Sequence, residues 1–150
     1  MSRAFESETL LDAEGALFSE ARTVRFQEVD AAGIVFYPRV FEYMSDAYVS
    51  FLGARGIHLP KAIEANEYRA PLIHVEADYR APMKFGDAIH VDVVAVTVGR
   101  TSFHLGYRIR HADGRVAAVG QTSHVCVGIP GFRPIPIPEE LRAALENKMA

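Results

Sequence analysis

Two kinds of hydrophobic pattern divide residues 22–129 into predicted strands and one predicted long helix. Residues 71–80 alternate apolar and polar side chains, and residues 88–99, 102–112 and 116–129 also have the composition of strands. A period of two is typical of strands that bury one face. The shorter alternation in RTVRFQEV predicts a first strand over residues 22–29. Short connections, one of them containing Asp113-Gly114, indicate antiparallel neighbours.

Residues 38–52 have the pattern of a helix instead. Pro38 suits the first helical position, and Gly53 and Gly56 are typical of a helix end. Apolar side chains cover most of the predicted helix, so half of its surface cannot lie in water. The pattern therefore predicts an α+β domain, in which a five-stranded antiparallel sheet wraps around one long central helix.

The remaining segments predict smaller elements. Residues 1–20 are expected to form an acidic extension or a short amphipathic helix, and residues 59–67 a brief helical or irregular segment. A proline-rich strap over residues 130–138 leads into a short terminal helix. Neither an internal repeat nor a second domain is evident, so we expect one domain over residues 21–150, preceded by the extension.

Composition and charge narrow the function classes. The 150 residues are 49% hydrophobic and 23% charged, which is typical of a globular chain. A net charge of -3 argues against a nucleic-acid partner, which would require a basic face. One cysteine excludes a disulfide within the chain. With neither a signal-like start nor a stretch of about 20 apolar residues, the sequence predicts a soluble cytoplasmic protein with no membrane partner.

Several common catalytic and cofactor motifs are absent. The sequence has no Gly-x-Ser-x-Gly, no phosphate loop, no dinucleotide glycine pattern and no Cys-x-x-Cys. Its six histidines lack the spacing of metal ligands, so no metal is predicted. Cys126 lies in an apolar run and is interpreted as a buried, unreactive thiol.

Asp30 is the acid whose position raises a functional question. An aspartate in a turn usually caps the following backbone, and Gly33 would allow a left-handed turn. The same position also precedes a helix start, where free N–H groups and the helix dipole stabilise negative charge. A carboxylate beside such an end provides a base and an oxyanion site together, which acyl transfer requires.

The stretch VRFQEVDAAGIVFYPRVFEYM, residues 24–44, resembles the acyl-CoA thioesterases of the hotdog fold, and most closely the 4-hydroxybenzoyl-CoA thioesterase type. The matching positions are Asp30, Ala32, Gly33, Ile34, Val35, Phe36, Tyr37 and Pro38. YRAPMKFGD, GRTSF and FRPIPIPEEL are also similar to family segments, so the resemblance covers about residues 21–145. It implies a hotdog fold and hydrolysis of an acyl-CoA thioester.

At the acyl end of the site, the resemblance implies that Asp30 is the catalytic carboxylate, as either nucleophile or general base. Backbone N–H groups in the Phe36-Tyr37 region would polarise the thioester carbonyl, and Gly33, Phe36 and Tyr37 would bind substrate. Tyr37 either lines the acyl pocket or packs on the core at the helix entry. Many short-chain relatives have His where Tyr37 stands, so this residue favours an aryl-CoA substrate.

At the coenzyme A end, arginine side chains are the natural partners of the phosphates. Arg100 is the first candidate, and Arg108 and Arg110 are weaker ones. Thr101 and Ser102 would bind the pantetheine arm or only form the turn. For each arginine, a solvated strand face is the alternative interpretation.

The resemblance also implies an assembly and leaves alternatives to catalysis. Family members form dimers whose sheets join edge to edge, commonly paired into tetramers, with each active site shared between subunits. The expected partner is an aryl- or short-chain acyl-CoA, with no separate cofactor because coenzyme A is part of the substrate. One alternative is a non-enzymatic acyl-CoA binding or regulatory protein on the same fold. Another is a hotdog dehydratase, for which His58 would be the candidate histidine.

Overall fold

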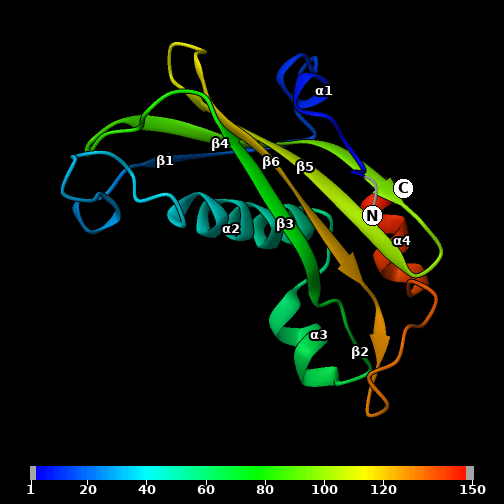
Figure 1. The fold of residues 1–150 in the computed structure, drawn as a ribbon. Coiled ribbons are helices and arrows are strands. Elements are labelled where there is room, and N and C mark those ends of the chain that lie inside the picture. The colour runs from blue at the N-terminus through cyan, green and yellow to red at the C-terminus, as the bar shows by residue number, and fades with distance from the viewer. Residues whose placement is uncertain (1–2, 148–150) are drawn as a thin grey trace.

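A computed structural model describes residues 3–147, which form an α+β fold built on a five-stranded antiparallel sheet (Figure 1). The strands are β1 (Phe18–Thr23), β3 (Leu72–Tyr79), β4 (Ala88–Val98), β5 (Ser102–His111) and β6 (Val116–Val125), in the spatial order β1-β4-β5-β6-β3. β3 to β6 confirm the strands predicted from alternation. Short connections between β4, β5 and β6 place these strands beside one another.

Helix α2 (Arg39–Ala54) lies against the concave face of this sheet (Figure 1). Its buried side chains are Val40, Tyr43, Met44, Ala47, Phe51 and Leu52. They pack against the inward side chains of β4 and β5, including Phe103, Leu105 and Tyr107, which have no exposed surface. The opposite side of α2, with Glu42, Ser45, Asp46 and Val49, is exposed in the single chain. The chain therefore covers one side of α2 and leaves an outward strip.

The smaller elements complete one end of the fold. Helix α3 (Leu59–Ala65) and helix α4 (Glu139–Glu146) lie near the carboxyl end of α2, beside a two-stranded sheet of β2 (Tyr68–Arg69) and β7 (Val127–Gly128). Arg55, the residue after α2, donates a hydrogen bond to the Ala144 carbonyl at 2.7 Å. Both short helices occur within the segments predicted for them, and Cys126 is buried as predicted.

The prediction of a first strand over residues 22–29 is wrong. β1 begins at Phe18, inside the segment predicted as an extension, and ends at Thr23. Residues Phe26–Glu28 form a 3-10 turn instead, which leaves Phe26 73% exposed. Val24 is fully buried, and its backbone pairs with Gly86 and Asp87 rather than continuing the strand.

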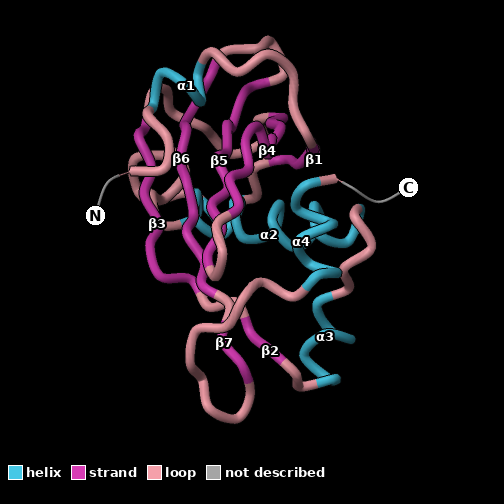
Figure 2. The backbone as a smooth tube through the Cα atoms, turned by 90° about the vertical axis from the view of Figure 1, so that its right-hand side faces the viewer, coloured by secondary structure: helices cyan, strands magenta, loops and turns pink. Residues whose placement is uncertain are grey.

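The amino-terminal segment packs on the outer face of the sheet. α1 (Ser7–Leu11) and α2 lie on opposite sides of the strands (Figure 1), and Figure 2 shows α1 near the upper part of β6. Leu10 is buried above Gly106 of β5, where a side chain would collide with it. Gln121 donates to the Phe5 carbonyl at 3.2 Å, which anchors the segment to β6. The short helix expected within residues 1–20 is thus present and covers the sheet.

Candidate active site

The loop before α2 contains a tight turn with Asp30 at its first position. The Gly33 N–H donates to the Asp30 carbonyl at 2.9 Å, and the Asp30 N–H donates to the Ile34 carbonyl at 2.9 Å. Gly33 adopts a φ of +80°, a conformation that side-chain-bearing residues rarely take. The function of Gly33 in this structure is therefore to form the turn that presents Asp30.

The Asp30 side chain both caps the turn and remains accessible. Its Oδ1 accepts the Ala32 N–H at 2.8 Å, the local bond expected of a turn aspartate. Its Oδ2 has no partner among residues 3–147, and the side chain is exposed. One carboxylate oxygen is thus fixed while the other is free to meet a ligand.

Asp30 lies at a groove of about 480 Å³ between the start of α2 and the end of β3. The lining residues are Asp30, Ile34, Val35, Tyr37, Val40, Tyr79, Arg80, Ala81, Pro82 and Met83. Apart from Asp30, Arg80 and the tyrosine hydroxyls, these side chains are apolar, and Met83 and Val40 are buried. The groove is of the size and character of a small-molecule site.

Only one of the two backbone N–H groups expected to polarise a carbonyl is available. The Phe36 N–H donates to the Glu28 carbonyl at 2.9 Å, so it is already satisfied. The Tyr37 N–H has no acceptor within the described residues. Tyr37 precedes the first turn of α2, where unpaired N–H groups and the helix dipole favour a negative oxygen. The Tyr37 N–H is therefore the candidate oxyanion donor.

The Tyr37 side chain lies in the groove and not in the core. It is 63% exposed, and its ring meets the Phe36 ring edge-on at 5.2 Å between centroids. Phe36 is also exposed but does not line the groove. Tyr79, at the end of β3, donates its hydroxyl hydrogen to the Tyr37 carbonyl at 2.7 Å. Tyr79 was not predicted as a site residue, because nothing along the chain indicates that β3 ends beside α2.

A buried carboxylate, Glu28, holds the chain just before this loop, and it was not predicted from the sequence. Glu28 is 2% exposed and accepts the Arg25 N–H at 2.8 Å and the Tyr43 hydroxyl at 3.0 Å. Arg22 and Arg25 lie 3.4 Å from its other oxygen. Burial alone would raise the pKa of Glu28, but these hydrogen bonds and positive charges together lower it below its usual value. Glu28 is therefore an ionised structural anchor.

The residues predicted to bind coenzyme A lie near the carboxyl end of α2, whereas Asp30 lies near its amino end. The Arg100 carbonyl accepts the Ile137 N–H at 2.9 Å, and Arg142 of α4 donates to the Gly99 carbonyl at 2.7 Å. This hairpin, with Thr101 and Ser102, thus adjoins α4 at the carboxyl end of α2. A helix of 16 residues is about 24 Å long. One chain does not bring Arg100, Thr101 and Ser102 to the Asp30 groove.

Arg108 and Arg110 are engaged in the fold. Both bind the buried carboxylate of Asp92, with Arg110 at 2.8 Å and Arg108 at 3.4 Å. Arg108 also donates to the Ala13 carbonyl at 2.7 Å, which ties the amino-terminal segment to the sheet. These contacts give both guanidinium groups a structural role, which favours a role in the fold over binding of the coenzyme A phosphates.

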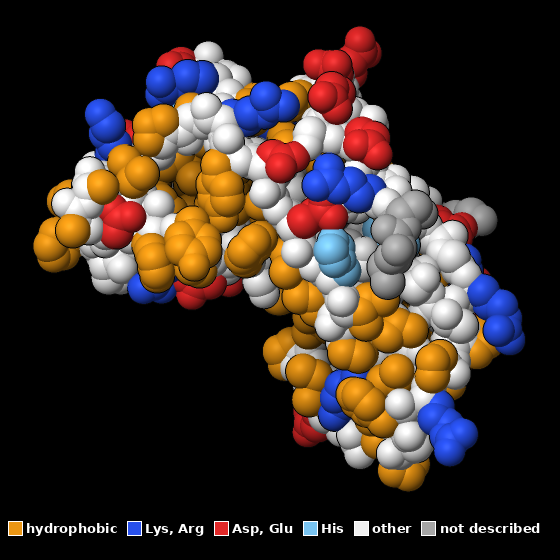
Figure 3. All heavy atoms as spheres, in the orientation of Figure 1, with side chains coloured by type: hydrophobic (Ala, Val, Ile, Leu, Met, Phe, Trp, Pro, Cys, Tyr) orange, Lys and Arg blue, Asp and Glu red, His pale blue; other side chains and the backbone are white. Residues whose placement is uncertain are grey.

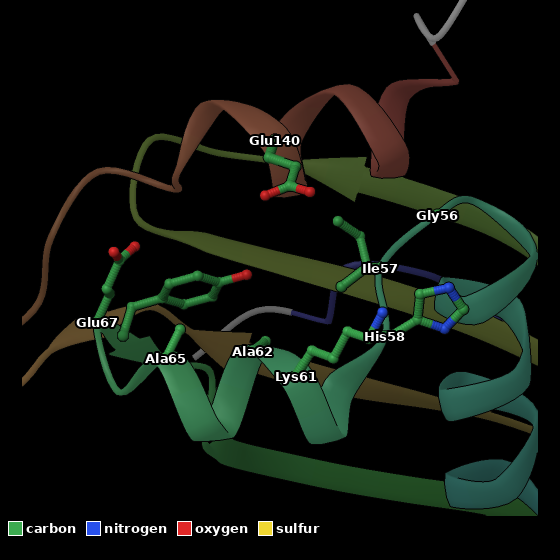
Figure 4. A pocket seen from close by; sticks show the side chains of 9 residues that line it. Gly56, Ile57, His58, Lys61, Ala62, Ala65, Glu67 and Glu140 are labelled. Carbon is green, nitrogen blue, oxygen red and sulfur yellow. The ribbon is translucent and has the colours of Figure 1, made fainter.

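Two further hollows lie at the α3 end of the molecule. A cleft of about 210 Å³ lies between α3 and α4. Figure 4 shows Glu67, Glu140 and His58 among the side chains that line it. Within the described part of the chain, the histidines that pair with an acid are His74 and His111, and His58 is not among them. Among residues 3–147, no group of three or more His, Cys, Asp or Glu side chains could hold a metal ion.

The second hollow is an apolar groove of about 430 Å³. Its lining residues are Tyr48, Leu52, Leu59, Ala62, Ile63, Tyr68, Arg69, Ala70, Pro71, Phe132 and Leu141. In Figure 3, hydrophobic side chains gather at the left, over the loop before α2, and at the lower right, over the α3 end. The Asp30 groove and the apolar groove thus lie at opposite ends of β3.

Comparison with known proteins agrees with this geometry. A model of the thioesterase-like superfamily matches residues 24–145. A 1,4-dihydroxy-2-naphthoyl-CoA hydrolase of Synechococcus elongatus is 31% identical over 126 residues, covering 83% of this chain and 92% of the relative. No helix among the described residues is long and apolar enough to cross a membrane.

Two solved structures share the fold. A 1,4-dihydroxy-2-naphthoyl-CoA thioesterase from Synechocystis superposes with a TM-score of 0.82 at 28% identity, over 87% of this chain and 96% of its own. A gentisyl-coenzyme A thioesterase superposes with a TM-score of 0.77 at 29% identity, over 85% of this chain and 99% of its own. Since the superfamily model spans most of the chain and these relatives are covered almost completely, the chain belongs to the thioesterase-like superfamily.

Proposed function

We propose that this protein hydrolyses an aryl-CoA or short-chain acyl-CoA thioester to the free acid and coenzyme A, with Asp30 as the catalytic carboxylate. The observation that carries the proposal is that the free Asp30 Oδ2 and the residue with the unpaired N–H, Tyr37, line the same Asp30 groove. The relatives named as hydrolases of aromatic CoA thioesters support the aryl class. No separate cofactor enters the proposed reaction.

In this reaction, the thioester carbonyl oxygen accepts the Tyr37 N–H, which stabilises the oxyanion as the tetrahedral intermediate forms. As a general base, Asp30 removes a proton from water while the water oxygen attacks the carbonyl carbon. As a nucleophile, Asp30 attacks that carbon itself, and water later hydrolyses the resulting anhydride. In both routes the C–S bond breaks and coenzyme A leaves as its thiolate. A single turnover in ¹⁸O-labelled water tests the nucleophilic route, because ¹⁸O enters the Asp30 carboxylate only when water attacks the Asp30 carbonyl of the anhydride, whereas the general-base route places ¹⁸O only in the released acid.

Asp30→Asn tests the catalytic assignment, because the amide oxygen retains the acceptor for Ala32 while basicity and nucleophilicity are lost. We expect thiol release from a panel of aryl- and short-chain acyl-CoA substrates to fall at least about 100-fold. Asp113→Asn is the matched control, since Asp113 Oδ1 makes the same kind of turn bond to the Arg115 N–H at 2.9 Å away from the groove. Equal turnover in the parent and in Asp30→Asn would refute the assignment.

A second copy of the chain would complete the site. β3 lies at the edge of the sheet, and within residues 3–147 it pairs with β6 alone. Leu72, Ile73 and Tyr79 on this edge strand are each about half exposed, as expected of a strand that pairs with another chain. The proposed dimer joins two β3 strands antiparallel, with ten strands in one sheet, and two dimers pair into a tetramer.

Antiparallel pairing of β3 has a direct consequence for the site. The two ends of β3 carry different grooves, so reversing the strand sets the Asp30 groove of one copy beside the apolar groove of the other. Arg100, Thr101 and Ser102 lie at the apolar-groove end, and the same pairing brings them toward the acid of the other copy. The proposed site thus combines an aromatic acyl pocket with a cation for the coenzyme A phosphates. In this assembly the joined hotdog sheet covers more of the surface of α2 than the sheet of one chain does.

Ile73→Lys tests the dimer. A lysine on the joined edge would place like charges opposite each other and separate the copies. Sedimentation velocity is expected to give a monomer, with loss of thioester hydrolysis. A variant that remains associated and active would contradict the shared site.

The alternative is a protein that binds acyl-CoA without hydrolysing it. One observation favours this alternative: Asp30 Oδ1 accepts the Ala32 N–H, so Asp30 already has a structural function in the turn. Calorimetric binding of an acyl-CoA with no thiol released over hours would establish it. Thiol release that depends on Asp30 would exclude it.

A further inference from the structure

Tyr79 lines the Asp30 groove but has no part in the reaction proposed above. It is the last residue of β3, and its backbone pairs with Ala118 of β6. Its ring lines the groove, and its hydroxyl reaches across to the Tyr37 carbonyl at 2.7 Å. The residues are 42 positions apart, so this bond is a tertiary tie between the sheet edge and the start of α2.

The bond acts on the residue that carries the unpaired N–H. Within α2 the Tyr37 carbonyl accepts only a long bond from the Val40 N–H, at 3.3 Å. The next residue is Pro38, whose N–H is missing and whose ring fixes φ. The Tyr79 hydroxyl therefore supplies the shorter of the two bonds that orient the Tyr37 carbonyl. The Tyr37 N–H lies in the preceding peptide plane, whose Phe36 carbonyl accepts the Arg39 N–H at 2.9 Å. The Tyr79 hydroxyl holds the following plane, so both peptide units at Tyr37 are restrained.

Resting on the proposed function, we infer that Tyr79 is a positioning residue for catalysis: by fixing the Tyr37–Pro38 peptide unit, its hydroxyl completes the restraint of the Tyr37 backbone that directs the Tyr37 N–H at the developing oxyanion. Such a donor stabilises the transition state only when its direction is fixed before the reaction. An angular or positional error at a reacting group lowers turnover more than it weakens substrate binding.

The chemical state of Tyr79 is compatible with this role. Partial burial, with a smaller effect of Tyr37, raises the pKa of Tyr79 above its ordinary value. The hydroxyl therefore keeps its proton, and donates it, at neutral and mildly basic pH. The ring is 48% exposed, so removing the hydroxyl leaves no buried polar atom on Tyr79 itself.

Tyr79→Phe tests the inference by removing the hydroxyl and keeping the ring in the groove. We expect kcat for acyl-CoA hydrolysis to fall about 10- to 100-fold, while KM changes by less than about threefold. Tyr107→Phe is the matched control, since its hydroxyl bonds to Thr122 Oγ1 at 3.0 Å in the fully buried core, outside the groove. The control is expected to lower the melting temperature at least as much as Tyr79→Phe, and to keep kcat.

The outcomes separate the inference from the proposed function. An active parent, an inactive Asp30→Asn and a fully active Tyr79→Phe would overturn the role of Tyr79 and leave the thioesterase assignment in place. Equal losses of kcat in Tyr79→Phe and Tyr107→Phe would show a general effect of stability and would also overturn it. A rise in KM with unchanged kcat would make Tyr79 a substrate-binding residue instead. A parent that hydrolyses no thioester would overturn both proposals.

Discussion

Replacing Glu28 with glutamine tests how the loop that carries Asp30 is held. The glutamine oxygen can still accept the Arg25 N–H and the Tyr43 hydroxyl, at the positions now 2.8 and 3.0 Å away. Its NH₂ group, however, would face the Arg22 and Arg25 guanidinium groups, which lie 3.4 Å from the other carboxylate oxygen. The substitution thus removes two charge-assisted contacts and sets donors against donors in a buried position.

The loss of unfolding free energy in Glu28→Gln can be estimated from the two guanidinium contacts. A hydrogen bond to a charged group is worth about 1.5–3 kcal/mol. Both guanidinium contacts are long, and the Arg25 side chain is 60% exposed, so both take the low end of this range, and that of Arg25 is reduced further by solvent. We therefore expect Glu28→Gln to lower the free energy of unfolding by about 2–3 kcal/mol at pH 7, which corresponds to a loss of about 5–10 °C in melting temperature.

The effect must depend on pH in a defined direction. The pKa of Glu28 is lowered in the folded state, so its stabilisation is complete above the unfolded pKa of about 4.3 and is lost as the pH falls through the folded value. The stability difference between parent and Glu28→Gln should accordingly be largest above about pH 5 and shrink below about pH 4.

Urea unfolding followed by circular dichroism at pH 7, 5, 4 and 3 measures this difference. Glu42→Gln is the control, because the Glu42 carboxylate is 57% exposed and its pair with Arg39 at 2.8 Å should contribute at most about 1 kcal/mol. A difference for Glu28→Gln that stays constant down to pH 3, or one no larger than that of the control at pH 7, would refute the reasoning.

Three other substitutions test the packing of the sheet. Gly120→Ala should destabilise the fold by several kcal/mol in urea unfolding, because its Cβ would lie 2.5 Å from the Glu76 carbonyl oxygen, a backbone atom of the paired strand. Gly106→Ala should cost less, since its Cβ meets the flexible end of the Leu10 side chain; equal losses would contradict this difference. Asp92→Asn should lower stability by about 3 kcal/mol, because it leaves two arginines beside an uncharged buried group, and an unchanged unfolding midpoint would show that water replaces the carboxylate.

The strands and helix that were predicted correctly are those in which inward positions are apolar. Phe103, Leu105, Tyr107 and Ile109 alternate along β5, and all are buried. A period-two pattern of large apolar side chains can be satisfied only by a strand with one covered face, so sequence and structure agree there.

β1 was misplaced because its inward positions do not have this pattern. Phe18, Glu20 and Arg22 are the half-buried positions of β1, and two of them are charged. Glu20 accepts a hydrogen bond from the Ser50 hydroxyl at 2.8 Å, and the Arg22 guanidinium lies 4.2 Å from the centre of the Tyr43 ring. Long charged side chains can cover a helix with their stems while their polar ends find partners. These partners are on α2, so the sequence of β1 alone does not reveal its inward face.

In the candidate site, too, some features follow from neighbouring residues in the sequence, and others depend on residues that only the fold brings together. The turn at Asp30 is encoded locally, by an aspartate and a glycine three positions apart, and both were identified from the sequence. Which N–H group remains free is decided elsewhere: the Glu28 carbonyl occupies the Phe36 N–H, and the Tyr79 hydroxyl restrains Tyr37 from the edge of the sheet. The edge strand that supplies this hydroxyl is also the strand on which the proposed dimer forms. In the proposed dimer, pairing of two copies would order the end of β3 and, through Tyr79, the backbone of Tyr37, so assembly and catalytic geometry would depend on the same strand.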